Sequence, residues 1–315
     1  LIVENVFMRL TTGWCFLTGL FVTFLSSTPS TAELLKVATF NVESYLDAPV
    51  ESRQAKPLES RAKVKESILV MRPDVIALQE LGGASALTEL RESLQRDGLA
   101  LPHWELLSAT DTNIHLAVLS RFPFTASRLY TNESFLLNGR RFHISRGIAE
   151  IDIAVNPAYS FTLIAAHLKS KRASPEAEES ELRLEEARIL REKIDARLEA
   201  NPELNLVVLG DFNDTIDSPP LRTVIGRGKT KLVDTRPAEG RSDSADGNGT
   251  RQRRSVTWTH FYSKDDSFRR IDFILLSRGM AREWIAEKSY VLALPNWGMA
   301  SDHRPVLAAF EAADR

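Results

Sequence analysis

The chain has 315 residues, of which 43% are hydrophobic and 26% are charged, and its 40 Lys and Arg against 42 Asp and Glu give a net charge of −2. This balance is typical of a globular protein. It excludes a disordered chain and a uniformly basic nucleic-acid coat, so any attraction for anions must be local. One cysteine excludes an internal disulfide framework and a cysteine-rich zinc site.

The first predicted element is an export signal at residues 1–32. An apolar run, Trp14–Leu25, follows Met8-Arg9 and precedes small residues that end at Ala32. This order is typical of a signal peptide, so we expect cleavage near Ala32 and export of the mature chain, to the periplasm or outside the cell. An uncleaved membrane anchor is the alternative, although the run is short for a bilayer span. We expect no stable membrane insertion of residues 33–315 after cleavage.

The remainder alternates strands and helices and predicts one sheet-rich α+β domain over residues 33–315. Strand signals occur at 34–41, 74–80, 114–119, 147–155, 161–167, 205–210, 256–259, 271–276 and 305–310. Helices are predicted at 59–70, at 87–95 and at about 175–198, the last with Ser174 as its N-cap and Pro175 as its first residue. The apolar stripe of this last helix predicts a scaffold role. Residues 237–255 are polar, rich in Gly, Ser and Asp, and predict a loop.

Polar residues recur where these predicted strands end. They are Asn41, Glu80, His167, Asp211 with Asn213, and Asp302 with His303. Each has a structural alternative when taken singly: Asn41 suits a turn, and His167 suits a hydrogen-bonded core histidine. Convergent polar groups at strand ends are where sites are usually built, so their recurrence favours one shared site.

These residues lie in motifs that resemble those of the endonuclease/exonuclease/phosphatase superfamily, the deoxyribonuclease I-like metal-dependent phosphoesterases. The motifs, in the order found in that superfamily, are Thr39-Phe40-Asn41-Val42, Asp74-Val75-Ile76-Ala77-Leu78-Gln79-Glu80, Ala166-His167-Leu168-Lys169, Gly210-Asp211-Phe212-Asn213-Asp214, Arg270-Ile271-Asp272-Phe273-Ile274-Leu275 and Ser301-Asp302-His303-Arg304-Pro305. The resemblance covers about residues 34–310. It implies a four-layer α/β/β/α sandwich, in which two packed, mainly antiparallel sheets are flanked by helices.

The resemblance also implies a metal centre. Glu80 matches the principal metal ligand, and Asn41 and Asp302 match direct or water-mediated ligands nearby. Mg²⁺ is the expected ion, with Mn²⁺ or Ca²⁺ as alternatives, because hard cations of this kind bind carboxylate and amide oxygens. Such an ion assists the attack of a water molecule on a phosphate ester.

The catalytic residues implied by the resemblance surround this metal centre. Asp211 matches the residue that holds the attacking water, and Asn213 the residue that orients the water or the phosphate. His303 matches a base or a phosphate-polarising imidazole that Asp272 orients, and His167 matches a second histidine that binds phosphate oxygens. Which histidine is the base stays open.

Substrate contacts are expected from basic residues beside these motifs. Arg146 lies where deoxyribonuclease-like members place a phosphate-contacting residue, and Lys169 begins a basic run that follows His167. A solvated surface charge is the alternative for both residues. His260 is interpreted as structural or exposed.

The leading hypothesis is an exported, Mg²⁺-dependent phosphodiesterase that acts as a monomeric endonuclease on DNA or RNA. The alternatives are a sphingomyelinase-like lipid-headgroup phosphodiesterase or a phosphomonoesterase, and a binding module that has lost catalysis. The full set of acidic, amide and histidine positions favours an enzyme. No long exposed aromatic hairpin is evident, which favours an anionic polymer, nucleic acid, over a lipid as the phosphodiester substrate.

Overall fold

The computed structural model describes residues 33–51, 53–240 and 255–313. The predicted export signal at residues 1–32 and most of the loop predicted at 237–255 lie outside the described residues. Among the residues that are described, no helix is both long and apolar enough to cross a membrane.

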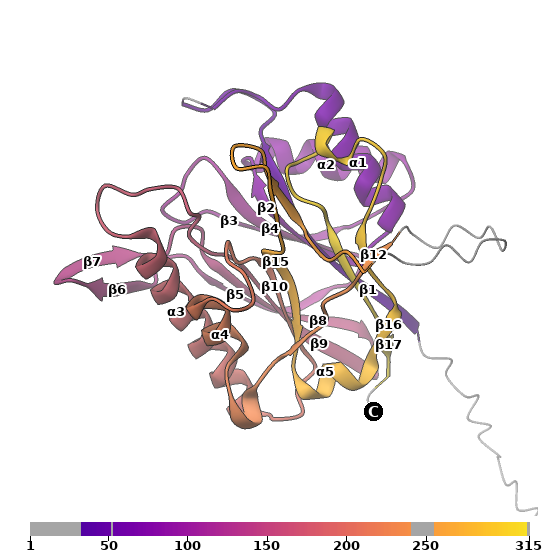
Figure 1. Ribbon diagram of the computed structural model, residues 1–315. Coiled ribbons are helices and arrows are strands. Elements are labelled where there is room, and N and C mark those ends of the chain that lie inside the picture. The colour runs from indigo at the N-terminus through magenta and orange to yellow at the C-terminus, as the bar shows by residue number, and fades with distance from the viewer. Residues whose placement is uncertain (1–32, 52, 241–254, 314–315) are drawn as a thin grey trace, which may run out of the picture. The chain divides into compact units, whose positions relative to one another are not determined.

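Two large sheets form the centre of the domain (Figure 1). The strands of the first sheet are β1 (Glu33–Tyr45), β2 (Val75–Leu81), β3 (His103–Leu107), β4 (His115–Ser120), β12 (Glu239–Gly240), β16 (Trp284–Leu292) and β17 (Val306–Ala312). The strands of the second are β5 (Phe124–Tyr130), β8 (Ile148–Asn156), β9 (Tyr159–His167), β10 (Leu206–Asp211), β11 (Val233–Asp234) and β15 (Asp272–Leu276). Two hairpins stand apart from them, β6 (Ser134–Leu137) with β7 (Arg140–His143) and β13 (His260–Tyr262) with β14 (Ser267–Arg269).

The strand orders are β12-β16-β17-β1-β2-β4-β3 and β11-β15-β10-β9-β8-β5. Three neighbouring pairs, β1–β2, β9–β10 and β12–β16, run parallel, and the other pairs run antiparallel. The prediction of mainly antiparallel sheets is therefore confirmed.

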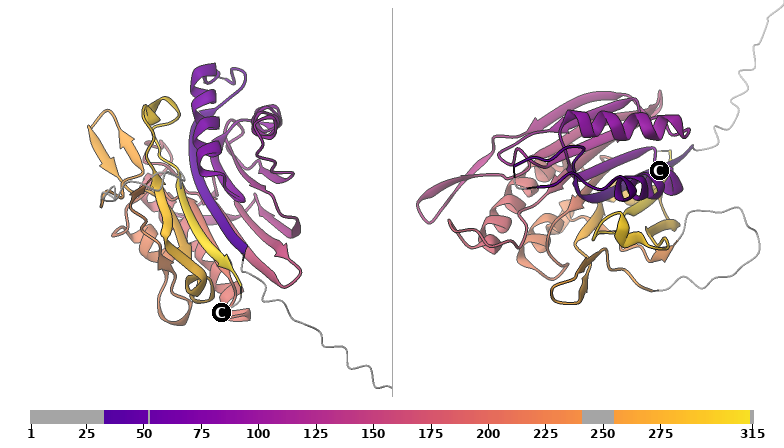
Figure 2. Two further views of the ribbon diagram at one scale, coloured as in Figure 1. Left: turned by 90° about the vertical axis from the view of Figure 1, so that its right-hand side faces the viewer. Right: turned by 90° about the horizontal axis from the view of Figure 1, so that it is seen from above.

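Helices cover the outer face of each sheet (Figure 2). The helices are α1 (Leu58–Met71), α2 (Ala84–Arg96), α3 (Glu179–Ala200), α4 (Pro219–Ile225) and α5 (Arg278–Glu283), with short 3₁₀ turns η1 (Gly228–Thr230) and η2 (Trp297–Met299). One apolar cluster joins α1 and α2 to the first sheet, and another joins α3 and α4 to the second. A third cluster lies between the sheets. These three apolar layers confirm the predicted four-layer sandwich.

Side-chain alternation along the strands places apolar residues on both faces of each sheet. In β1, Val37 belongs to the cluster between the sheets and Ala38 to the cluster beneath α1 and α2. In β10, Val207 and Val208 divide in the same way. Because both faces are buried, these strands are continuous apolar runs in the sequence.

Two details of the prediction are wrong. The helix predicted from Pro175 begins at Glu179, where acidic Glu179 and Glu181 in the first turn suit the positive end of the helix dipole. The strand predicted at 256–259 is irregular, and β13 begins only at the next residue. The Thr259 hydroxyl there accepts hydrogen bonds from the N–H groups of Ile271 and Asp272, and its carbonyl accepts one from the N–H of Arg304, so the segment is fixed without a strand ladder.

Candidate active site

Strand pairing in the second sheet brings three predicted catalytic residues together. Strand β10 lies between β9 and β15, and the ladders pair Asp211 with His167 on one side and with Asp272 on the other. The preceding residue, Gly210, has a φ of 141°, and a Cβ atom there would lie 1.8 Å from the carbonyl oxygen of Ala166. Only glycine permits this approach of β10 to β9.

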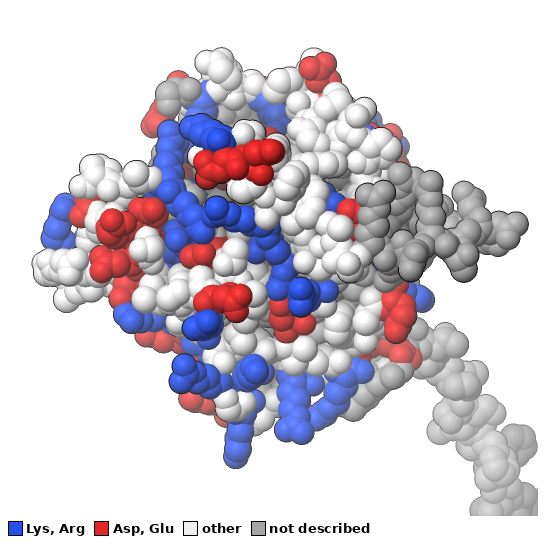
Figure 3. All heavy atoms as spheres, viewed as in Figure 1, with Lys and Arg blue, Asp and Glu red and all other residues white. Residues whose placement is uncertain are grey.

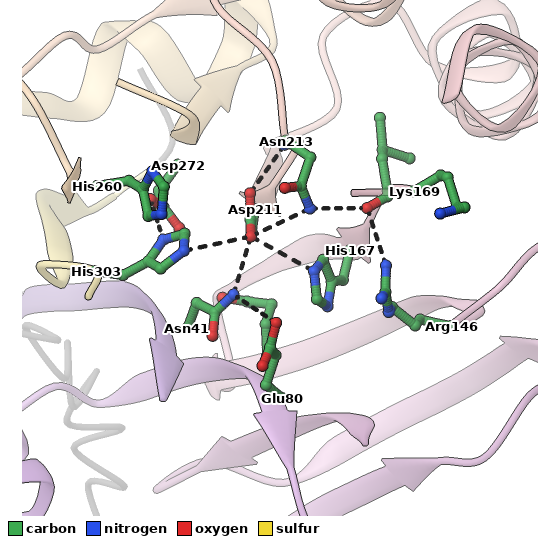
Figure 4. Close-up of polar contacts among 12 residues, drawn as sticks. Asn41, Glu80, Arg146, His167, Lys169, Asp211, Asn213, His260, Asp272 and His303 are labelled. Atoms are coloured by element: carbon green, nitrogen blue, oxygen red, sulfur yellow. Dashed lines mark hydrogen bonds and ion pairs between the residues drawn. The ribbon is translucent and has the colours of Figure 1, made fainter. Parts of the chain in front are cut away.

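Asn41 and Glu80 reach the same place from β1 and β2 of the first sheet (Figure 4). Asn41 Nδ2 donates to Asp211 Oδ2 at 2.9 Å and lies 3.5 Å from Glu80 Oε1. Glu80 Oε2 accepts a hydrogen bond from the N–H of Ser44 at 3.1 Å. Glu80 has a φ of 61°, a left-handed conformation that non-glycine residues seldom adopt and that clusters at functional sites.

His303 lies between two carboxylates. Its Nδ1 is 2.8 Å from Asp272 Oδ2, and its Nε2 is 3.8 Å from Asp211 Oδ2. Burial lowers the pKa of His303, but Asp272 and Asp211 outweigh burial and raise that pKa to about 10. Burial and the charge of Asp272 raise the pKa of Asp211 to about 7. In this arrangement His303 is a charged imidazolium at neutral pH, and Asp211 is poised to exchange a proton.

His167 has the opposite character. Its Nε2 lies 3.4 Å from Asp211 Oδ2 and has no hydrogen-bond partner among the described residues. Burial, followed by the charges of Arg146 and His303, lowers the pKa of His167 well below its ordinary value. His167 is therefore a neutral imidazole, and the two histidines differ in charge.

Asn213 joins the loops that follow β9 and β10. Its Nδ2 donates to the Leu168 carbonyl at 2.9 Å and to Asp211 Oδ2 at 3.3 Å, and its backbone N–H donates to Asp211 Oδ1 at 2.8 Å. Like Glu80, Asn213 has a positive φ, here 54°. Four of the residues predicted to be catalytic or metal-binding, Asn41, His167, Asn213 and His303, thus converge on the carboxylate of Asp211.

Acidic side chains gather beside Glu80. Glu43, Glu80 and Asp302 line one cavity of about 580 Å³. Burial raises the pKa of Glu43, and the negative charges of Asp302 and Glu80 raise it further. The buried ammonium of Lys56, 3.6 Å from Glu43 Oε2, offsets part of this repulsion. Glu43 and Lys56 belong to none of the motifs named above, so the sequence alone did not point to them.

His260, interpreted from the sequence as structural or exposed, is half-buried and also lines this cavity. An isolated bridge pairs His260 with His303, and their ring centres lie 4.5 Å apart. His260 Nε2 is 3.5 Å from Asp302 Oδ2. Burial raises the pKa of Asp302, but the hydrogen bond from His260 and the charge of His303 lower it overall. The bridge to His303 joins segments far apart in the sequence, so the position of His260 at the cavity is evident only in the folded structure.

Arg146 and Lys169 lie on the opposite side of the site from His303, with Arg146 beside His167 (Figure 4). Arg146 Nη1 donates to the Leu168 carbonyl at 3.2 Å. Burial and the charge of Arg146 lower the pKa of Lys169. The predicted substrate-binding residues are thus adjacent to the reacting centre and separate from its carboxylates.

Helix α3, predicted as scaffold, holds this basic side in place. Glu186 Oε1 accepts a hydrogen bond from the Ser145 N–H at 2.9 Å, and Glu186 Oε2 accepts one from the Lys169 N–H at 2.6 Å. Arg183, one turn earlier, donates to the Lys169 carbonyl at 3.0 Å and to Asp214 Oδ2 at 3.0 Å. One helix therefore fixes the loops that carry Arg146, Lys169 and Asn213.

Comparison with known families identifies the family of the chain. The model of the Endonuclease/Exonuclease/phosphatase family matches residues 38–303. The chain belongs to this family. It is accordingly a metal-dependent phosphoric ester hydrolase. A search of curated proteins finds no match.

Solved structures of other proteins share the fold of this family member. The human Nocturnin catalytic domain with bound sulfate is 16% identical, with a TM-score of 0.61 over 89% of this chain and 95% of that chain. Truncated Caenorhabditis elegans TDP2 is 17% identical, with a TM-score of 0.58 over 89% and 98%. Sphingomyelinase C from Streptomyces griseocarneus is 16% identical, with a TM-score of 0.59 over 89% and 100%. At these identities the similarity establishes the fold alone.

The residues of this phosphoesterase fit a divalent metal ion. Glu43, Glu80 and Asp302 offer carboxylate oxygens. Burial raises the pKa of Glu43, the charges of Asp302 and Glu80 raise it further, and a cation would relieve that repulsion. Carboxylate and amide oxygens suit hard divalent cations. A second candidate group, in which ligand atoms of His260, Asp302 and His303 lie within 4.8 Å of one another, includes imidazole nitrogens that suit transition metals better.

Proposed function

We propose that the protein is an exported, Mg²⁺-dependent phosphodiesterase, and that it is a nuclease acting as an endonuclease on DNA or RNA. The observation that carries this proposal is the convergence on Asp211. Two histidines of different charge and two asparagines contact one buried carboxylate at the meeting point of the two sheets, beside Glu80 (Figure 4). Hydrolysis of a phosphate ester requires such a set of proton carriers next to a cation site.

The residues divide the chemistry among them. Glu80 would hold the metal ion, with Asn41 and Asp302 as direct or water-mediated ligands. When bound, a divalent ion neutralises charge on the phosphate and polarises its P–O bond. Asp211, whose pKa is raised to about 7, holds the attacking water and takes its proton.

The two histidines and Asn213 act on the phosphate itself. His303, kept charged by Asp272 and Asp211, donates from Nε2 to a phosphate oxygen and stabilises the developing negative charge. His167, neutral and buried, binds a second oxygen, and Asn213 orients the water or the phosphate. In this scheme Asp211 is the general base, and neither histidine has to accept the proton of the attacking water.

The surface around the site supports a polyanionic substrate. Lys171, Arg172, Lys264 and Arg269 line the first cavity. Lys and Arg side chains also gather on the face seen in Figure 3, although the whole chain has a net charge of −2. A local positive rim attracts and orients a phosphate backbone. A similarly folded TDP2 from D. rerio has been solved in complex with a single-strand DNA product, at 18% identity and a TM-score of 0.57.

A sphingomyelinase-like lipid phosphodiesterase is the second candidate, and one observation favours it. The hairpin β13–β14 beside the cavity exposes 53% of Phe268 and 40% of Tyr262, and Met299 of η2 is 47% exposed. Exposed apolar side chains beside a site suit a membrane surface. The hairpin is short, but its exposed aromatic side chains weaken the prediction that the substrate is not a lipid. Export, the monomeric state and the lack of membrane insertion stay predictions.

The test is an assay of the purified protein on plasmid DNA, RNA, sphingomyelin and p-nitrophenyl phosphate, with Mg²⁺, Mn²⁺, Ca²⁺ or EDTA. We expect metal-dependent cleavage of nucleic acid that disappears in Glu80→Ala and in His303→Ala. Activity confined to sphingomyelin or the monoester would refute the nuclease and retain the metal-dependent site. Cleavage of nucleic acid that persists in EDTA would refute the metal dependence.

A further inference from the structure

A second cavity, of about 560 Å³, adjoins the reacting centre. Its ionisable lining residues are four bases and two acids: Arg53, Arg146, Lys169, Arg172, Glu80 and Asp111. Glu80 and Arg172 also line the first cavity. A molecule whose reacting phosphate lies in the first cavity therefore meets an excess of positive charge as soon as it extends past Glu80.

Arg146 is the most deeply placed of these bases. Its side chain is only 9% exposed, and its Nε has no hydrogen-bond partner among the described residues. The nearest carboxylate oxygen to Nε, Asp111 Oδ2, is 3.8 Å away. A guanidinium has five N–H donors, and leaving a buried charged donor unsatisfied is costly. An oxyanion in the cavity would satisfy it.

Two of the other bases, Lys169 and Arg53, are held at the cavity wall by hydrogen bonds. The Lys169 backbone is fixed by Glu186 and Arg183, and Lys169 Nζ donates to the Arg172 carbonyl at 3.1 Å. Arg53 Nη1 donates to Ser44 Oγ at 2.9 Å. Burial, followed by the positive charge of Arg146, lowers the pKa of Lys169. The cavity is thus a preorganised site for an anion.

We infer that the second cavity binds a second phosphate of the substrate, next to the one that is cleaved, and that the substrate is therefore a nucleic-acid strand. This inference rests on the proposed function. A nucleic-acid strand carries a phosphate on every residue, so a neighbour of the cleaved phosphate is always present. A choline lipid carries a quaternary ammonium beyond its single phosphate, and four bases would repel it.

The experiment compares ligands that differ by one phosphate. Dissociation constants of thymidine 3′,5′-bisphosphate, thymidine 3′-monophosphate and thymidine 5′-monophosphate are measured by calorimetry on the full chain with Mg²⁺. We expect the bisphosphate to bind at least about tenfold more tightly than either monophosphate. Arg53→Gln and Arg172→Gln should each reduce this ratio severalfold, whereas Arg96→Gln, an exposed residue of α2, should leave it unchanged. A ratio near one in the wild type, or one that Arg53→Gln and Arg172→Gln leave intact, would overturn the inference.

Two further arms separate the inference from the proposed function. Cleavage of single-stranded DNA and RNA is assayed in parallel with binding. Cleavage without a bisphosphate advantage keeps the nuclease and overturns the second-phosphate site. A bisphosphate advantage without cleavage of either polymer keeps the site and overturns the nucleic-acid substrate. Inositol 1,4-bisphosphate tests a small-molecule source: binding as tight as that of the thymidine bisphosphate would also overturn the nucleic-acid substrate.

Discussion

The two cavities that share Glu80 differ in charge and in how their residues are held. The first combines buried carboxylates and histidines such as Asp211 and His303 with basic residues such as Lys171 and Arg269, and ladder pairing sets the position of Asp211. The second is basic and is built largely from loop residues such as Arg53 and Arg172. Strand pairing thus fixes the chemistry, while loops, which tolerate change more readily, set which substrate reaches it.

Replacing Glu80 should give the largest effect, because this carboxylate lines both cavities and is the proposed principal metal ligand. We expect Glu80→Gln to lower kcat by about a thousandfold. The variant should also lose the rise in melting temperature that Mg²⁺ gives the wild type, since metal binding stabilises the folded state by mass action. Steady-state assays and thermal melts with and without Mg²⁺ measure both. Glu92→Gln on the exposed face of α2 is the matched control. An unchanged Mg²⁺-dependent melting shift in Glu80→Gln would place the ion elsewhere.

Replacing Asp211 should lower activity but raise stability at alkaline pH. The pKa of Asp211 is raised from 3.8 to about 7 by burial and by Asp272, so the folded state binds this proton more tightly than the unfolded state does. Stability is then lost as the pH rises from about 4 to about 7, and the ionised carboxylate destabilises the fold above that range. We expect Asp211→Asn to lower kcat by about a hundredfold or more.

The same substitution should raise the melting temperature at about pH 8 by a few degrees, and this gain should vanish below about pH 4. Melting curves in EDTA across this pH range measure the effect without bound metal. Equal or lower stability of Asp211→Asn at the alkaline end would contradict the raised pKa.

The basic side can be disturbed through its support on α3. Glu186→Gln replaces an acceptor of the Ser145 and Lys169 N–H groups by a group with one acceptor oxygen and one donor nitrogen. We expect kcat/KM to fall about tenfold on single-stranded DNA, mostly through a higher KM, because Arg146 and Lys169 shift. Glu199→Gln, exposed on the same helix, is the control. A loss confined to kcat would mean that Glu186 acts on the reacting centre instead.

The salt dependence of kcat/KM tests whether Arg53, in the second cavity, contacts a phosphate of the substrate. If Arg53 contacts a phosphate, Arg53→Gln should reduce the slope of log kcat/KM against log salt by about 0.7 on a single strand. Cleavage rates of an oligonucleotide at increasing NaCl concentration measure the slope. Arg96→Gln, at an exposed residue of α2, is the control. Equal slopes for the wild type and Arg53→Gln would remove Arg53 from the substrate path.

The exposed hairpin should give the smallest effect if the substrate is nucleic acid. We expect Phe268→Ala to change the cleavage of single-stranded DNA by less than about threefold, because loss of one stacking surface is partly compensated by neighbours. A lipid phosphodiesterase would instead lose most of its activity on sphingomyelin vesicles. Parallel assays on DNA and on vesicles distinguish the two.

Sequence reasoning succeeded where burial leaves a strong pattern. Strands β2 and β10 are buried on both faces and read as continuous apolar runs, and their polar ends identified Glu80 and Asp211. Strands β5 and β16 were missed, because their exposed positions break that pattern. The contact between Asn41 and Asp211 joins residues 170 apart, a separation that only the order of family motifs made interpretable.

The sequence did not point to His260 or Glu186, and the reason is the same for both residues. His260 faces the cavity through a hairpin and a bridge to His303 that no periodicity encodes. Glu186 lies on a helix whose pattern is that of ordinary scaffold, and its role depends on which loops pack against it. Both roles arise from tertiary contacts between distant segments, and the local sequence carries no signal for them.

The most direct measurement is a crystal structure of the protein with Mn²⁺ and thymidine 3′,5′-bisphosphate, with the ion located by its anomalous scattering. We expect the ion at Glu80, one phosphate beside His303 and Asn213, and the other beside Arg146 in the second cavity. An ion away from Glu80, or a second phosphate pointing to solvent or toward the β13–β14 hairpin, would contradict the division of the site into a metal-bearing and a phosphate-binding half.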